Sequence, residues 1–117
     1  MRTIGGQELN VLRFLWDNEP ASVHDVFEHW GKQAGLARTT VLTVMERLRR
    51  KGYLTRVKGK DSLQYRSVDA REKVLNEVVD TFVRDRLGGS LAPLVAYLAQ
   101  PGIVVEGSET VAMPDGE

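Results

Sequence analysis

The sequence contains no cysteine, which excludes disulfide bonds, a thiol redox switch, a cysteine nucleophile and any zinc site built on thiolates. It contains no apolar run of membrane-spanning length, and its first residues, MRTIGGQELN, lack the apolar core of a signal peptide. We therefore expect a cytoplasmic protein with no membrane insertion. The 117 residues, 42% of them apolar, fit one domain of modest core with at most a small appendage.

The formal net charge is zero, but the charges are unevenly distributed along the chain. Residues 38–66 hold nine basic and two acidic residues, a net charge of +7, and the remainder carries −7. A basic stripe within one segment is typical of a nucleic-acid surface, because each neutralised phosphate releases condensed counterions. The alternative is a basic patch that binds acidic proteins or has no partner.

Groups that could support catalysis or bind a metal are few. The only histidines are His24 and His29, and on a helix their five-residue spacing places them about 140° apart. We interpret them as surface residues rather than metal ligands. The sequence also shows no glycine-rich phosphate loop. We therefore expect no metal, no cofactor and no enzymatic activity.

The most informative stretch is residues 38–52, RTTVLTVMERLRRKG. Its apolar residues recur at three- and four-residue spacing, which predicts a helix with one buried face. These residues are Val41, Val44, Met45 and Leu48. Gly52 is placed to end the helix, and we expect a hydroxyl of Thr39 or Thr40 to cap its first turn.

Leu42 lies outside this apolar face, among threonines. Such a combination fits a helix in the DNA major groove, where hydroxyls reach phosphates or base edges and an apolar side chain contacts a thymine methyl. The alternative is that Leu42 packs under a neighbouring segment and that the arginines are ordinary surface charge.

The flanking segments predict the remainder of a winged helix. We expect a helix over residues 6–17, a turn over 18–21 and a helix over 22–30 that Ser22 and Asp25 cap. Two alternating runs around GKDS, residues 59–62, predict a β-hairpin. We interpret Tyr53 and Tyr65 as hairpin core, and Trp16 and Trp30 as core anchors. The expected fold class is mainly α (α+β), a winged helix-turn-helix domain followed by C-terminal dimerisation helices.

The C-terminal third predicts two helices and a tail. A helix over 69–87, capped by Asp69, is followed by a glycine pair, a short helix over 90–98 and a flexible tail over 101–117. The apolar stripe is wider than a small core needs, which favours a surface for a second copy over a helix folded back on its own domain. The expected dimerisation residues are Val74, Leu75, Val78, Val79, Phe82, Val83, Leu87, Leu91, Leu94, Val95 and Leu98. The predicted divisions are 1–68, 69–100 and 101–117.

Three segments appear in an order and spacing that identify a family resemblance. They are ELNVLRFLWDNEPASVHDV, ARTTVLTVMERLRRKGYLTRVKGKDSLQYRSVDAREK and RLGGSLAPLVAYLAQ. From about residue 6 to residue 100 the chain resembles the penicillinase-repressor family of BlaI/MecI type. The resemblance implies a homodimeric winged-helix repressor that occludes a promoter by binding double-stranded operator DNA with two-fold symmetry.

The same resemblance assigns residues by position. It implies base-facing side chains at Thr39, Thr40, Leu42 and Thr43. It implies phosphate contacts from the helix and the hairpin, or wing, at Arg38, Arg47, Arg50, Arg56, Lys58 and Lys60.

The sequence departs from parts of the family pattern. Members that a membrane-bound protease regulates are cleaved at an Asn-Phe bond, and the corresponding place here holds Tyr97-Leu98, so a regulatory protease stays an open partner. Copper-responsive relatives carry C-terminal cysteines, which this chain lacks. Two other classes compete with the repressor: a winged-helix protein-interaction module without specific DNA binding, and a regulator with a small-molecule pocket beside the dimer helices.

Overall fold

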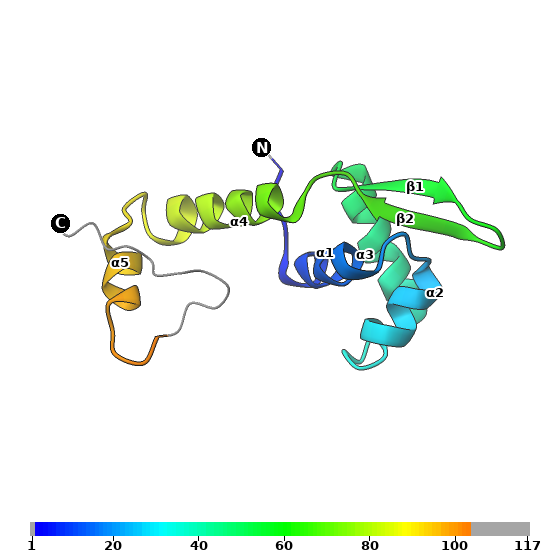
Figure 1. Cartoon of the computed structure of the whole chain (residues 1–117), viewed down its shortest axis with the longest axis horizontal. Helices are drawn as coiled ribbons and strands as arrows, with labels where there is room; N and C mark the ends of the chain where they lie inside the picture. The colour runs from blue at the N-terminus through cyan, green and yellow to red at the C-terminus, as the bar shows by residue number, and fades with distance from the viewer. Residues whose placement is uncertain (1, 104–117) are drawn as a thin grey trace. The chain divides into compact units, whose positions relative to one another are not determined.

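The structure is a computed structural model in which residues 2–103 are described. The order of elements is α1 (Gly6–Asn18), α2 (Val23–Val26), η1 (Phe27–Gly31), α3 (Arg38–Arg50), β1 (Leu54–Lys58), β2 (Leu63–Ser67), α4 (Arg71–Arg86) and α5 (Ala92–Leu98), as Figure 1 shows. The chain divides into two compact units, and the division lies between Thr81 and Phe82.

The first unit is built around one apolar core to which its helices and hairpin all contribute. Its buried members are Val11, Leu12, Leu15, Ala21, Val26, Val41, Val44, Met45, Leu48, Tyr53, Leu54, Tyr65 and Val74. The periodic face of α3 is buried as predicted, and so are both hairpin tyrosines. Trp16 and Trp30 pack against this core while remaining partly exposed.

The second helix is not a regular α-helix. Ser22 and Asp25 cap it reciprocally, because the Asp25 amide donates to Ser22 Oγ at 3.1 Å and the Ser22 amide donates to Asp25 Oδ2 at 3.0 Å. One α-helical turn, α2, then gives way to the π-helix η1. Gly31 is buried where η1 meets α3, and an added Cβ would lie 2.6 Å from Val41 Cγ2. Glycine therefore allows the two helices to approach closely.

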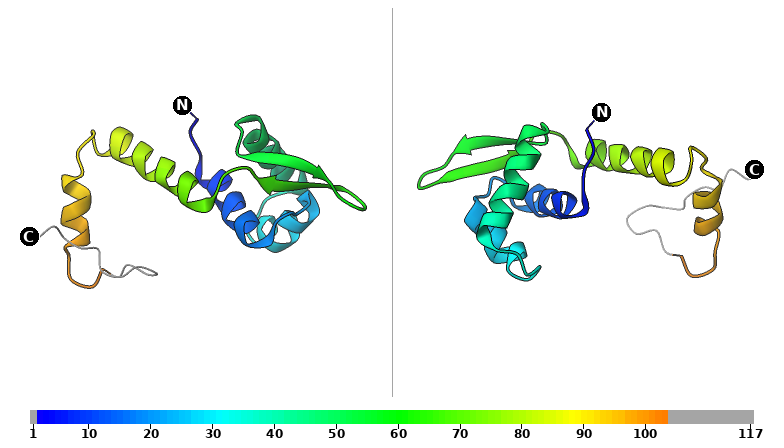
Figure 2. Two further views of the ribbon diagram at one scale, coloured as in Figure 1. Left: turned by 45° about the horizontal axis from the view of Figure 1, so that its top comes forward. Right: turned by 180° about the vertical axis from the view of Figure 1, so that it is seen from behind.

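The hairpin begins where α3 ends (Figure 2). Gly52 has a φ of 89°, which fits the predicted C-terminal glycine. Strands β1 and β2 pair antiparallel, with Arg56 opposite Tyr65 and Lys58 opposite Leu63. Ala21 adds a bridge to Tyr65, its amide donating to the Tyr65 carbonyl at 3.0 Å, within the stretch that we predicted as a simple turn. The hairpin is thereby fixed to the loop that precedes α2.

Residues 71–81 of α4 lie in the first compact unit, whereas the predicted division lay at residue 68. Val74 is only 1% exposed and lies in the core, so we reassign it from the expected dimer surface to the domain interior. Asp69 lies two residues before α4, and its carboxylate binds the side chains of Arg2 and Lys73. The predicted N-cap at Asp69 is therefore replaced by side-chain contacts.

The second unit contains the end of α4, a glycine pair and α5. Gly88 and Gly89 both have positive φ, 70° and 91°, which breaks the helix as predicted. The Ala92 amide donates to Ser90 Oγ at 3.1 Å. Residues 104–117, which include most of the predicted tail, lie outside the described residues. Among the helices that are described, none is both long and apolar enough to cross a membrane.

Candidate nucleic-acid interface

The outer side of α3 presents the four residues expected to face bases. Thr39, Thr40, Leu42 and Thr43 are all exposed, and Leu42 leaves 43% of its surface open to solvent. The alternative in which Leu42 packs under a neighbouring segment is therefore wrong. An apolar side chain held open between hydroxyls can contact another molecule without a rearrangement of the domain.

The expected threonine cap is also wrong. Ala37 is the N-cap of α3, and no side chain caps this helix. The Thr43 hydroxyl instead donates to the Thr39 carbonyl oxygen at 3.0 Å, one turn back. Because its proton is used inside the helix, Thr43 can offer a partner only its oxygen lone pairs and its methyl group.

The nine basic residues of segment 38–66 fall into two groups. Arg49 and Lys51 are partly buried and form ion pairs, with Glu46 at 2.9 Å and Glu8 at 2.8 Å respectively. The other seven are exposed and form no ion pair within residues 2–103. They are Arg38, Arg47, Arg50, Arg56, Lys58, Lys60 and Arg66. Of the two acidic residues in the segment, Glu46 pairs with Arg49 and only Asp61 is exposed, so the exposed charged residues of the segment are seven basic and one acidic.

Glu46 joins α3 to the hairpin. Its carboxylate accepts two bonds from Arg49, at 3.0 and 2.9 Å, and one from the Tyr65 hydroxyl of β2 at 2.5 Å. Arg49 and then Tyr65 hold the pKa of Glu46 below its ordinary value. Burial, and then the bond to Glu46, raise the pKa of Tyr65 to about 12. The sequence reveals the three-residue spacing between Glu46 and Arg49, but it gives no signal for the contact with Tyr65.

The wing supplies three of the expected phosphate contacts. Arg56 and Lys58 lie two residues apart on β1 and so share one face of the strand, and Lys60 lies in the turn. All three side chains are exposed. At the base of the hairpin, Glu19 accepts hydrogen bonds from the Ser67 amide at 2.5 Å and from the Ser67 hydroxyl at 2.9 Å. The wing thus presents positive charge from an element tied to the domain at its base.

Comparison with known proteins identifies the family. The model of the family described as penicillinase repressor matches residues 4–109. This chain belongs to the penicillinase repressor family. Two proteins named transcriptional regulator BlaI, from the CDC 1551 / Oshkosh and H37Rv strains of Mycobacterium tuberculosis, are each 31% identical over 102 residues. Those alignments cover 85% of this chain and 74% of each relative.

One solved structure supports the fold of this penicillinase repressor family member. It is a MarR family protein from Bacillus stearothermophilus, with a TM-score of 0.54 and 20% sequence identity. The match covers 82% of this chain and 69% of that one. The winged-helix prediction is confirmed at the level of fold.

Proposed function

We propose that this chain is a homodimeric transcriptional repressor that binds a two-fold operator and occludes a promoter. Family membership supports the coarser statement that it is a transcriptional regulator. The observation that carries the finer proposal is the surface of α3, where exposed Leu42 and three threonines lie beside exposed basic residues without ion-pair partners among residues 2–103. Small hydroxyls and one apolar group suit base edges, and the surrounding cations suit phosphates.

The residues divide into two roles. Thr39, Thr40, Leu42 and Thr43 read bases, and Leu42 contacts a thymine methyl group. The phosphate contacts come from Arg38, Arg47, Arg50, Arg56, Lys58 and Lys60. The first role gives sequence preference, whereas the second gives affinity that depends on salt.

Dimerisation relies on apolar side chains that the monomer leaves open. Leu75, Val79 and Phe82 follow each other at four- and three-residue spacing, so they share one side of α4, and each is exposed. Leu91, the N-cap of α5, and Val95 on α5 are likewise exposed. An apolar stripe of this kind is typical of a surface that a second protein covers, and a second copy matches the two-fold operator.

The test is binding of the purified protein to its own upstream promoter DNA across a salt series. Six phosphate contacts in each of two protomers give a slope of log affinity against log salt of up to about 11. Lys58→Ala, present in both protomers, should reduce that slope by about 2 on any sequence. Thr40→Ala should keep the slope and reduce the preference for the operator over scrambled DNA.

The outcomes separate the alternatives. Saturable binding to a discrete two-fold site supports the repressor. Equally weak binding to every sequence would mean that the basic surface binds DNA without sequence preference. A dimer that binds no DNA at low salt would contradict the proposal and favour the protein-interaction module.

A further inference from the structure

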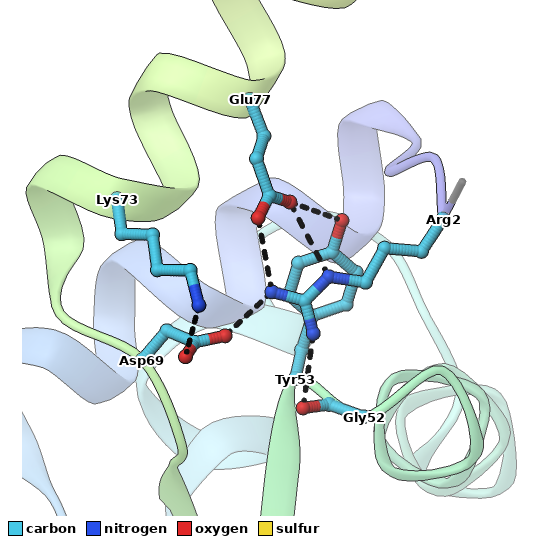
Figure 3. A network of polar contacts seen from close by, with 6 residues as sticks. All are labelled: Arg2, Gly52, Tyr53, Asp69, Lys73 and Glu77. Carbon is cyan, nitrogen blue, oxygen red and sulfur yellow. Dashed lines mark hydrogen bonds and ion pairs between the residues drawn. The ribbon is translucent and has the colours of Figure 1, made fainter.

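Arg2 connects parts of the first unit that are distant in sequence. Its guanidinium donates to the Gly52 carbonyl at 3.1 Å, to Asp69 at 2.5 Å and to both oxygens of Glu77 at 3.3 and 3.2 Å. Figure 3 shows the side chain lying among these groups, beside the ring of Tyr53. The guanidinium carbon is 3.9 Å from the centre of that ring. One side chain therefore contacts the end of α3, the start of the hairpin, the residue pair before α4 and α4 itself.

The partners of Arg2 also hold one another. The Tyr53 hydroxyl donates to Glu77 Oε1 at 3.3 Å, and Lys73 donates to Asp69 at 3.2 Å. Arg2 holds the pKa of the Asp69 carboxyl below its ordinary value, and Lys73 adds to this effect against partial burial. The planar guanidinium fixes its partners in direction as well as distance, which a lysine ammonium would not do.

Glu77 brings the Arg2 cluster to the second turn of α4, and the other contacts of this helix lie close by. Val74 is the fully buried residue of α4, Val78 packs against the core one turn later, and Arg71 at the start of the helix pairs with Asp17 of α1 at 2.8 Å. Glu77 lies beside Val78, so its bonds to Arg2 and Tyr53 add a directional polar contact to this apolar anchor and resist a pivot of the helix about Val74. Arg2 thereby helps to fix the direction of residues 71–81 of α4 within the first unit.

We propose that Arg2 is a positioning residue that determines which spacing of operator half-sites the dimer accepts. The inference rests on the proposed function, because α3 must read DNA and α4 must carry the dimer surface. From Val74 to Arg86 the helix is about 18 Å long, so a pivot of about 10° about Val74 moves its far end by about 3 Å in each protomer. The rise of DNA is roughly 3.4 Å per base pair, so such a pivot is enough to change the accepted spacing by one base pair.

The experiment measures affinity for a set of operators whose half-sites are moved apart or together by one and two base pairs. Wild-type protein should prefer one spacing over its neighbours by about tenfold, a discrimination of 1.4 kcal/mol. Arg2→Ala should reduce that preference to about threefold or less, and Arg2→Lys should fall between the two. Lys32→Ala, which removes an exposed cation whose ion pair is with Glu28 four residues earlier, is the control and should leave the preference unchanged.

The spacing preference distinguishes positioning from a general loss of folded protein. A destabilised variant binds every operator less well by the same factor, so the ratio between spacings does not change. Glu77→Gln is the second variant, which keeps the size of the side chain and removes its charge, and it should broaden the preference as Arg2→Ala does. Thermal unfolding measured in parallel gives the folded fraction of each variant.

Two results would overturn the inference in different ways. If wild type binds its operator specifically and Arg2→Ala and Glu77→Gln keep the full spacing preference, the positioning role is wrong and the proposed function stands. If wild type binds none of the operators, the proposed function fails and the positioning role fails with it.

Discussion

The two compact units of this chain differ in how they use apolar side chains. The first unit buries thirteen hydrophobic residues in one core, from Val11 to Val74. No residue between Phe82 and Ile103 is buried, although this stretch carries Phe82, Leu91, Val95 and Tyr97. The first unit therefore contains the core that folding requires, whereas the second exposes apolar surface that another chain can cover.

The largest expected effect is a difference in the free energy of unfolding between a core variant and a surface variant. Leu12→Ala removes a fully buried side chain of α1 and should lower the free energy of unfolding by about 2 to 5 kcal/mol, because the cavity collapses only in part. Leu42→Ala, on the exposed side of α3, should change it by less than about 0.5 kcal/mol. Urea denaturation at one protein concentration measures both. Equal losses would mean that Leu42 has a structural role in the free protein.

The next effect concerns the second unit. Phe82→Ala truncates a side chain that is 46% exposed and should raise the dimer dissociation constant about tenfold or more. Sedimentation equilibrium measures the constant, and unfolding of the monomer should be nearly unchanged because Phe82 is outside the core. Asn76→Ala, on another side of α4, is the control. An unchanged constant for Phe82→Ala would place the dimer contact elsewhere.

A smaller effect tests base reading by Leu42. Replacing the operator thymine that Leu42 contacts with deoxyuridine deletes one methyl group, and should weaken binding about fourfold, the equivalent of about 0.8 kcal/mol. In Leu42→Ala the same replacement should cost almost nothing, since the partner of the methyl group is absent. Thymines outside the contact serve as the control in a scan of operator positions. A deoxyuridine penalty that persists in Leu42→Ala would contradict the assignment.

The smallest effect is a pH dependence of the first unit. The folded protein lowers the pKa of Asp69 and Glu46, so their contribution to stability is present above the ordinary carboxyl values of about 4 and is lost on further acidification. The raised pKa of Tyr65 acts at the other end, where its contribution is lost between about pH 10 and about 12. Urea midpoints at several pH values measure both limits. Asp69→Asn and Glu46→Gln should lose less stability than wild type between pH 5 and pH 3, and an identical loss would exclude these carboxylates as the cause.

The sequence predicted those parts of the fold whose signals are local. The face of α3 was readable because Val41, Val44, Met45 and Leu48 repeat with the helical period, and Leu42 was exposed as that period requires. The predictions for Gly52 and for the Ser22–Asp25 cap are confirmed for the same reason, because each residue affects only the backbone within a few positions.

The sequence did not reveal features that depend on distant partners. Arg2 contacts Gly52 and Glu77, which are 50 and 75 residues away, and no periodicity records such pairs. Val74 repeats with the exposed residues of α4, so the pattern alone could not separate its buried side from its open side. The prediction of a threonine cap was wrong because Ala37 is the N-cap and the Thr43 hydroxyl bonds to the Thr39 carbonyl instead. A threonine hydroxyl can bond either to a free amide at the start of a helix or to a carbonyl one turn back, and composition does not decide between them.

The contact of Glu46 with β2 has a consequence for the entropy of binding. Because Glu46 joins α3 to Tyr65 in the free protein, the helix and the wing that the proposed function assigns to DNA are linked before any DNA binds. Little conformational freedom is then lost on association, and less of the contact energy is offset by ordering. Two rigid elements at a fixed separation also respond to the width of the groove between them, so the protein would discriminate among DNA sequences by their shape as well as by their bases.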